Sequence, residues 1–121
     1  MIDSNIIIFL SKGQIEIDDI LSNYDKILVS IISYMEIYGY SFKNKREKAL
    51  VDAFFNLVEV IGINKSIANI VIDYRKTANK KIKLPDAIIL ASAKYMSADL
   101  LTDDWDDFVD VDNDVNVLKL R

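Results

Sequence analysis

The chain contains no cysteine and no histidine among its 121 residues. The absence of cysteine excludes disulfides and thiol chemistry. The absence of histidine removes the commonest general base, the usual zinc ligand and the serine-type triads. Acid–base or metal chemistry would have to use carboxylates, lysine, tyrosine or water. Ligand sets made of oxygen alone favour a hard cation such as Mg²⁺ or Mn²⁺.

Long apolar runs are also missing, and none approaches the roughly 20 residues of a membrane span. The first residues lack the basic-then-apolar order of a signal peptide. We therefore expect a soluble cytoplasmic protein with no membrane partner. A hydrophobic content of 51% provides a normal core, and the length fits one domain over residues 1–121. The net charge of −4 argues against a general nucleic-acid coat protein, but it leaves room for a local acidic metal site beside a basic groove.

Short β-branched runs alternate with segments of helical apolar spacing. Strands are expected over residues 1–3, 26–31, 58–63, 99–102 and 115–120. Helices are expected over residues 6–12, with Ser4 and Asn5 as cap, and over 15–24, 32–40, 47–57, 64–79 and from Pro85 onward, with a single turn over 105–108. Strands separated by helices favour an α/β fold in which helices cover both faces of a parallel sheet of four or five strands.

The segment 84–93 (LPDAIILASA) predicts a buried helix with one carboxylate at its start. Pro85 suits the first helical position, and Asp86 suits the first turn near the helix dipole. The residues that follow are nearly all apolar or small, which is typical of an interior helix. Asp86 would thus lie where a core helix meets the surface. A helix-starting acid is the simplest interpretation, so a functional site requires other acids to converge on Asp86.

Acids from other segments are expected at the same edge of the sheet. Asp3 ends the first strand, Glu36 lies in the helix after the second, and Asp104 and Asp107 follow the strand 99–102. In open α/β sheets, sites form beyond the carboxyl ends of the strands. Carboxylates gathered there repel one another unless a cation neutralises them. One or two Mg²⁺ or Mn²⁺ ions would do so and would activate a water molecule.

Seven aspartates fall between positions 103 and 114. Their D-x-D-x-D spacing over 110–114 suggests a calcium loop, but its sixth and twelfth positions hold Val115 and Arg121 instead of glycine and glutamate. Most of the run is therefore expected to be surface loop. Its position along the chain leaves Asp104 and Asp107 as alternatives for one acid of the site, and leaves open whether Trp105 borders the site or packs.

Two lysines, Lys81 and Lys83, come just before Asp86. They are interpreted either as an exposed helix end or as a rim that follows a phosphate backbone.

Four stretches carry a family resemblance along the whole chain. They are Asp3-Ser4-Asn5 and the segments 30–39 (SIISYMEIYG), 84–93 and 100–108 (LLTDDWDDF). In this order and spacing they resemble the motifs of PIN-domain ribonucleases, and most closely those of VapC-type toxins of bacterial toxin–antitoxin pairs. The resemblance implies a PIN-like three-layer sandwich.

The resemblance also implies roles for particular residues. Asp3, Glu36 and Asp86 would be catalytic metal-site carboxylates, with Asp107 as the fourth acid and Asp104 able to share its role. Asn5 and Thr102 would orient ligands or substrate. The implied activity is that of an endoribonuclease, a nuclease that hydrolyses RNA phosphodiester bonds with Mg²⁺ or Mn²⁺. The implied partners are the RNA substrate, a cognate antitoxin whose tail blocks the site, and a second copy in a homodimer.

One departure from the family pattern concerns the N-terminus. Only Met1 and Ile2 precede Asp3, whereas family members usually have several apolar residues there. We expect a short first strand, and it stays open whether native residues precede Met1. The short strand is the support for an alternative, a catalytically inactive PIN-like binding or assembly module. A phosphatase with an aspartyl nucleophile is a weaker alternative, because it would need Asp-x-Asp and Asn5 occupies the second place.

Overall fold

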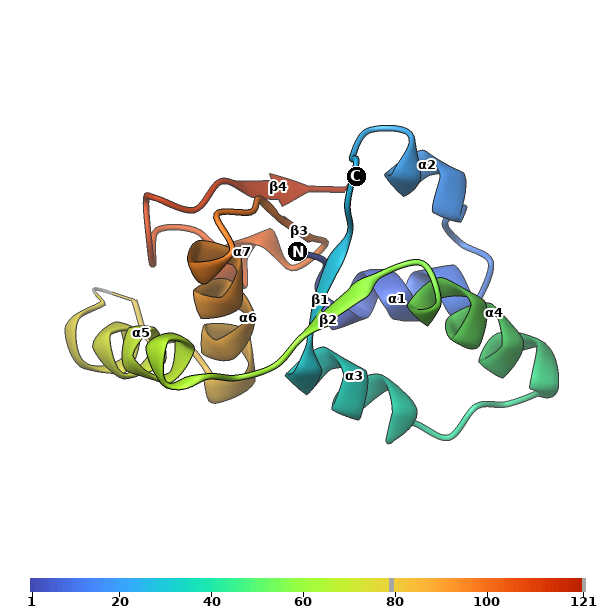
Figure 1. Cartoon of the computed structure of the whole chain (residues 1–121), viewed down its shortest axis with the longest axis horizontal. Helices are drawn as coiled ribbons and strands as arrows, with labels where there is room; N and C mark the ends of the chain where they lie inside the picture. Colours follow the sequence, from blue (N-terminus) through green and yellow to red (C-terminus); the bar gives the residue numbers. More distant parts are fainter. Residues whose placement is uncertain (79, 121) are drawn as a thin grey trace.

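A computed structural model of the chain describes residues 1–78 and 80–120. These residues form seven helices and four strands (Figure 1). In chain order they are α1 (Ser4–Ser11), α2 (Ile17–Leu21), β1 (Leu28–Ser30), α3 (Ile31–Tyr38), α4 (Lys45–Phe55), β2 (Glu59–Ile61), α5 (Lys65–Thr77), α6 (Leu84–Tyr95), β3 (Leu100–Thr102), α7 (Trp105–Phe108) and β4 (Val117–Lys119).

The strands form a parallel arrangement joined at its centre by one residue. β1 pairs with β2, and β3 pairs with β4, both in parallel. Ile2 forms parallel bridges to Val29 of β1 and to Leu101 of β3. The strand order is therefore β2–β1–Ile2–β3–β4, and the predicted parallel sheet is confirmed. The expected strand over 1–3 is reduced to the bridging residue Ile2.

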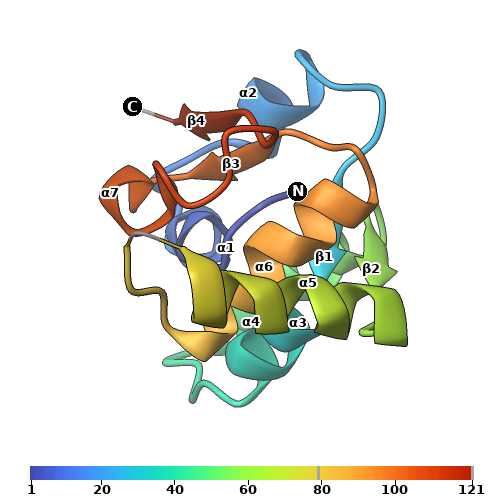
Figure 2. The same ribbon diagram turned by 90° about the vertical axis from the view of Figure 1, so that its left-hand side faces the viewer.

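Successive residues of the central strands point to opposite faces of the sheet, as the period of two requires. Leu28 and Leu100 pack with the buried side chains of α5 and α6, whereas Val29 and Leu101 pack with those of α1 and α4. Figure 2 shows α5 and α6 side by side on one face. Each fully buried Leu, Ile or Phe contributes about 1.5–3 kcal/mol. The two apolar layers confirm the predicted three-layer α/β sandwich.

Several predicted boundaries are wrong by a few residues. α1 begins at Ser4 and its cap is Asp3, so the expected cap at Ser4 and Asn5 is corrected. Aspartate is as good an N-cap as serine or asparagine, and Asp3 is the residue that has the required extended backbone. α2 is shorter than the expected 15–24, and every strand is three residues long. α5 ends at Thr77, and residue 79 of the expected helix lies outside the described residues.

Within residues 1–78 and 80–120, no helix is long and apolar enough to cross a membrane.

Candidate active site at the carboxyl edge of the sheet

The centre of the sheet brings the start of the chain between two distant strands. The Ile2 N–H donates to the Leu28 carbonyl (2.9 Å), and the Asp3 N–H donates to the Leu101 carbonyl (3.0 Å). β1 ends on one side of Asp3, and β3 ends on the other side at Thr102. Because the strands are parallel, the residues that follow them meet at one edge.

Asp3 is a buried carboxylate at this edge, with 4% of its surface exposed. It caps α1 by accepting a hydrogen bond from the Ser4 N–H (2.7 Å), and its second oxygen accepts one from the Thr102 hydroxyl (2.9 Å). Burial raises the pKa of Asp3, and the negative charges of Asp104 and Glu36 raise it as well, whereas the two hydrogen bonds lower it. The net pKa is raised, so the ionised carboxylate is held at a cost in free energy.

Asp86 lies in the first turn of α6 and is partly buried. Its pKa is raised to about 6, first by burial and then by neighbouring carboxylates. These carboxylates belong to Asp3, Asp107 and Glu36. Lys83, at the cap of α6, partly offsets the rise. Carboxylates from three other segments thus lie close enough for their charges to affect Asp86. The sequence predicted only that these acids share one edge of the sheet.

The first turn of α1 contacts two of these acids through hydrogen bonds. The Ser4 hydroxyl donates to a Glu36 carboxylate oxygen (3.0 Å), and the Asn5 amide donates to Asp104. The Thr102 hydroxyl, which donates to Asp3, also accepts a hydrogen bond from the Asp104 N–H (2.9 Å). The contact of Ser4 with Glu36 was missed in the sequence. Its only signal there was the position of Ser4 directly after the first acid.

The two alternatives for the fourth acid have different neighbours at the edge. Asp104 is the cap residue of α7 and lies near Asp3, whereas Asp107 is exposed in α7 and acts on Asp86. The structure therefore brings both acids to the edge.

Of the two basic residues proposed as a phosphate rim, one affects the acids through its charge. Lys83 lies close enough to Asp86 to affect its pKa. Lys81 is exposed on the connector before α6, and it forms no salt bridge within the described part of the chain.

The acids do not form a complete metal-ligand shell. Among residues 1–78 and 80–120, no three side chains of the types that bind metals are grouped closely enough to hold an ion. The chemistry of the donors nevertheless fits a hard divalent cation, because every donor is oxygen and neighbouring carboxylates raise the pKa of Asp3 and of Asp86. A cation between them would remove this repulsion.

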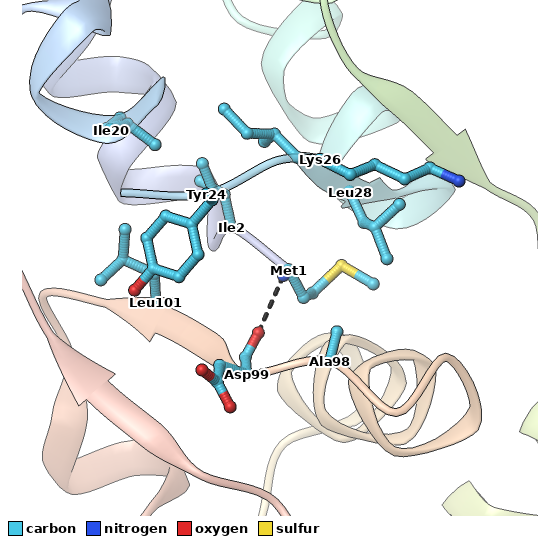
Figure 3. Close-up of a pocket in the computed structure, with 10 residues that line it drawn as sticks. Met1, Ile2, Ile20, Tyr24, Lys26, Leu28, Ala98, Asp99 and Leu101 are labelled. Atoms are coloured by element: carbon cyan, nitrogen blue, oxygen red, sulfur yellow. Dashed lines mark hydrogen bonds between the residues drawn. The ribbon is translucent and has the colours of Figure 1, made fainter. Parts of the chain in front are cut away.

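A separate hollow of about 230 Å³ lies at the opposite, amino-terminal edge of the sheet (Figure 3). Its lining is mainly apolar and includes Ile20, Tyr24 and Leu101. The Met1 ammonium donates to the Asp99 carbonyl (2.8 Å), and burial lowers its pKa to about 6, although the Asp99 charge opposes this shift. None of the acids of the candidate site lines this hollow.

The fold and the acidic edge define an α/β protein in which carboxylates from four segments gather at the carboxyl edge of the sheet. The chain belongs to the PIN domain family, because the family model "PIN domain" matches residues 1–114. The predicted family is therefore confirmed, and PIN domains are generally nucleases.

Solved structures with this fold include proteins of toxin–antitoxin systems. A toxin–antitoxin complex from Klebsiella pneumoniae is 28% identical in sequence, with a TM-score of 0.80, covering 99% of this chain and 96% of that one. DNA-bound VapBC from Salmonella typhimurium is 22% identical, with a TM-score of 0.84 and coverage of 100% and 97%. VapBC2 from Rickettsia felis, bound to a DNA fragment from their promoter, is 19% identical, with a TM-score of 0.79 and coverage of 98% and 96%. A comparison with curated protein sequences finds no match.

Proposed function

We propose that this protein is a Mg²⁺- or Mn²⁺-dependent endoribonuclease and the toxin of a toxin–antitoxin pair. The observation that carries the proposal is the convergence of acids at the carboxyl edge. The Thr102 hydroxyl links Asp3 to Asp104, and Ser4, the residue after Asp3, is hydrogen-bonded to Glu36. The charges of Asp3, Glu36 and Asp107 also raise the pKa of Asp86, which supports their proximity. Bringing four carboxylates together costs free energy, because their negative charges repel one another. A bound cation would offset this cost and explains the arrangement best.

The residues that would hold the cation are Asp3, Glu36, Asp86 and Asp107, with Asp104 beside them. A bound Mg²⁺ or Mn²⁺ would activate a water molecule and stabilise the charge that develops on the phosphate.

The chain itself orients these acids. The Thr102 hydroxyl and the Ser4 N–H fix both oxygens of Asp3, and the Asn5 amide fixes Asp104. Such supporting contacts typically change metal affinity or activity 10- to 100-fold when they are removed, and an effect of about this size is expected here.

The direct test is cleavage of a labelled single-stranded RNA in Mg²⁺, in Mn²⁺ and in EDTA. Asp86→Asn is assayed in parallel, with Asp73→Asn as the control. Asp73 is an exposed aspartate of α5, so its substitution makes the same charge change away from the acids. Cleavage that requires the cation and disappears only in Asp86→Asn would support the proposal. Cleavage by a folded Asp86→Asn protein would sink it.

A catalytically inactive binding module is the second candidate. It is favoured by the lack of a complete ligand shell in the described residues. Thermal melting with and without Mn²⁺ separates the two candidates, because a cation that binds the native state raises its stability by about 2.7 kcal/mol at 100 times the dissociation constant. An unchanged melting temperature together with no cleavage would favour the inactive module.

The partners follow from the same proposal. The similar structures from Klebsiella pneumoniae and Salmonella typhimurium are complexes of toxin–antitoxin systems, which supports a cognate antitoxin for this chain. Exposed apolar side chains on and after α3, those of Tyr34, Met35 and Tyr40, support an interface with a protein partner or a second copy. Light scattering on the purified chain tests the homodimer, and a monomer at all concentrations would refute it.

A further inference from the structure

Trp105 is the only tryptophan of the sequence, and its side chain is exposed beside the acids. It begins α7, directly after Asp104 and two positions before Asp107. Its indole N–H donates to the Val117 carbonyl of β4 (3.3 Å), yet 38% of the residue stays exposed. One edge of the ring is thus fixed on the protein while part of the ring remains open to solvent.

A hollow of about 220 Å³ lies beside this ring. Its lining combines one aromatic residue, one lysine and four aspartates: Asp103, Asp104, Trp105, Asp106, Asp107 and Lys119. The hollow borders the proposed active site directly, because Asp104 accepts a hydrogen bond from Asn5 and Asp107 acts on Asp86. A group bound here would lie next to the bond that the acids cleave.

The residues that line the hollow limit which chemical groups can bind there. Carboxylates repel phosphate, so the sugar–phosphate backbone is an unsuitable occupant. An unpaired nucleobase suits it, because bases stack on aromatic side chains and a carboxylate accepts hydrogen bonds from base N–H groups. Guanine offers adjacent imino and amino N–H donors on its Watson–Crick edge, whereas uracil offers one N–H between two carbonyls.

We propose that Trp105 stacks an unpaired base of the RNA beside the cleaved bond, and that Asp106, a carboxylate of the lining outside the proposed metal ligands, favours guanine. This inference rests on the proposed nuclease function. Lys119, which also lines the hollow and is exposed, would neutralise the phosphate next to the bound base. Trp105 is then a positioning and specificity-determining residue, and the chemical step is left to the acids.

The test uses Asp86→Asn protein in Mg²⁺, so that RNA binds without being cut. Short single-stranded RNAs that differ in one base are titrated while the anisotropy of the labelled RNA and the fluorescence of Trp105 are both recorded. Stacking quenches indole fluorescence, and a purely structural tryptophan would not respond to the base. We expect quenching on binding and the highest affinity for the guanine-containing RNA.

Variants separate stacking from packing. Trp105→Phe keeps an aromatic face and is expected to bind within a few-fold of the parent. Trp105→Leu keeps apolar volume but cannot stack, and it should weaken binding about 5- to 150-fold, the value for one stacked base. Tyr95→Leu is the matched control, because Tyr95 is exposed at the far end of α6 from Asp86.

The outcomes distinguish this inference from the function on which it rests. If the wild type cleaves RNA but Trp105→Leu binds as tightly as its parent and Trp105 is not quenched, the inference is overturned and the nuclease stands. Equal affinity for all four bases overturns the selection of guanine. If the wild type neither binds nor cleaves RNA, the proposed function and this inference fail together.

Discussion

Replacing Asp86 by asparagine is expected to stabilise the metal-free protein while it abolishes cleavage. A pKa of about 6 in the folded protein, against 3.8 for an unperturbed carboxyl, means that folding disfavours the ionised form. At pH 7 this shift corresponds to at most about 3 kcal/mol. Solvent reaches the partly buried carboxylate and reduces the cost. The lost attraction to the start of α6 removes another ~0.3–1 kcal/mol, so we expect a net gain of about 1–2 kcal/mol.

Thermal and urea unfolding in EDTA at pH 7 measure this gain, which should raise the melting temperature by roughly 3–8 °C. The pH dependence of this gain follows from the difference between the folded and unfolded pKa of Asp86. Because the folded pKa is raised, the ionised Asp86 costs no stability below pH 3.8, and the cost develops as the pH rises through about 6. The advantage of Asp86→Asn should therefore disappear in acid. The exposed control Asp73→Asn should stay within about 0.5 kcal/mol of the wild type at every pH.

Added Mn²⁺ should make the wild type more stable than Asp86→Asn, because the wild type gains binding free energy that Asp86→Asn lacks. An Asp86→Asn protein that is no more stable than the wild type in EDTA at pH 7 would contradict this prediction. That result would mean that the repulsion among the acids is absent in the folded protein.

Three further substitutions test other parts of the structure. Thr102→Val removes the buried hydroxyl that is bound to Asp3, so urea unfolding should show a loss of about 1–3 kcal/mol that Thr102→Ser largely restores. Burial of Asp112 would raise its pKa, but hydrogen bonds that include one from Lys94 (2.7 Å) outweigh burial and lower it. The advantage of the wild type over Asp112→Asn, measured by thermal melting, should thus hold above pH 3.8 and vanish as the pH falls further; an advantage that persists in acid would contradict this. Phe54→Ala empties a fully buried position and should cost about 3–5 kcal/mol in urea unfolding, and a cost below 1 kcal/mol would mean that the core collapses around it.

Local sequence patterns were enough to predict the elements that present the acids. The apolar run after Asp86 predicted an interior helix, and α6 is buried along most of its length. The single turn over 105–108 was predicted with the bounds that α7 has. These elements depend on contacts between near neighbours in the chain, which the spacing of apolar residues reports directly.

The boundaries of the short elements were less predictable. The strands are three residues long because pairing partners, which sequence periodicity does not contain, decide where a strand ends. Asp3 was predicted as a strand end, but in the structure it also caps α1, because the chain turns into a helix directly after the bridge of Ile2.

The amino-acid composition limits the chemistry that is available: with no histidine and no cysteine, a metal centre would have oxygen ligands, and acids follow the ends of several strands. How these acids meet depends on the pairing of distant segments in the folded protein. Ile2 pairs with Val29 and Leu101, residues that are far apart in the chain, and this pairing sets Asp3 between the two halves of the sheet. The raised pKa of Asp86 is a sum over charges from three other segments and over burial. Both depend on distances through space, which spacing along one chain does not fix.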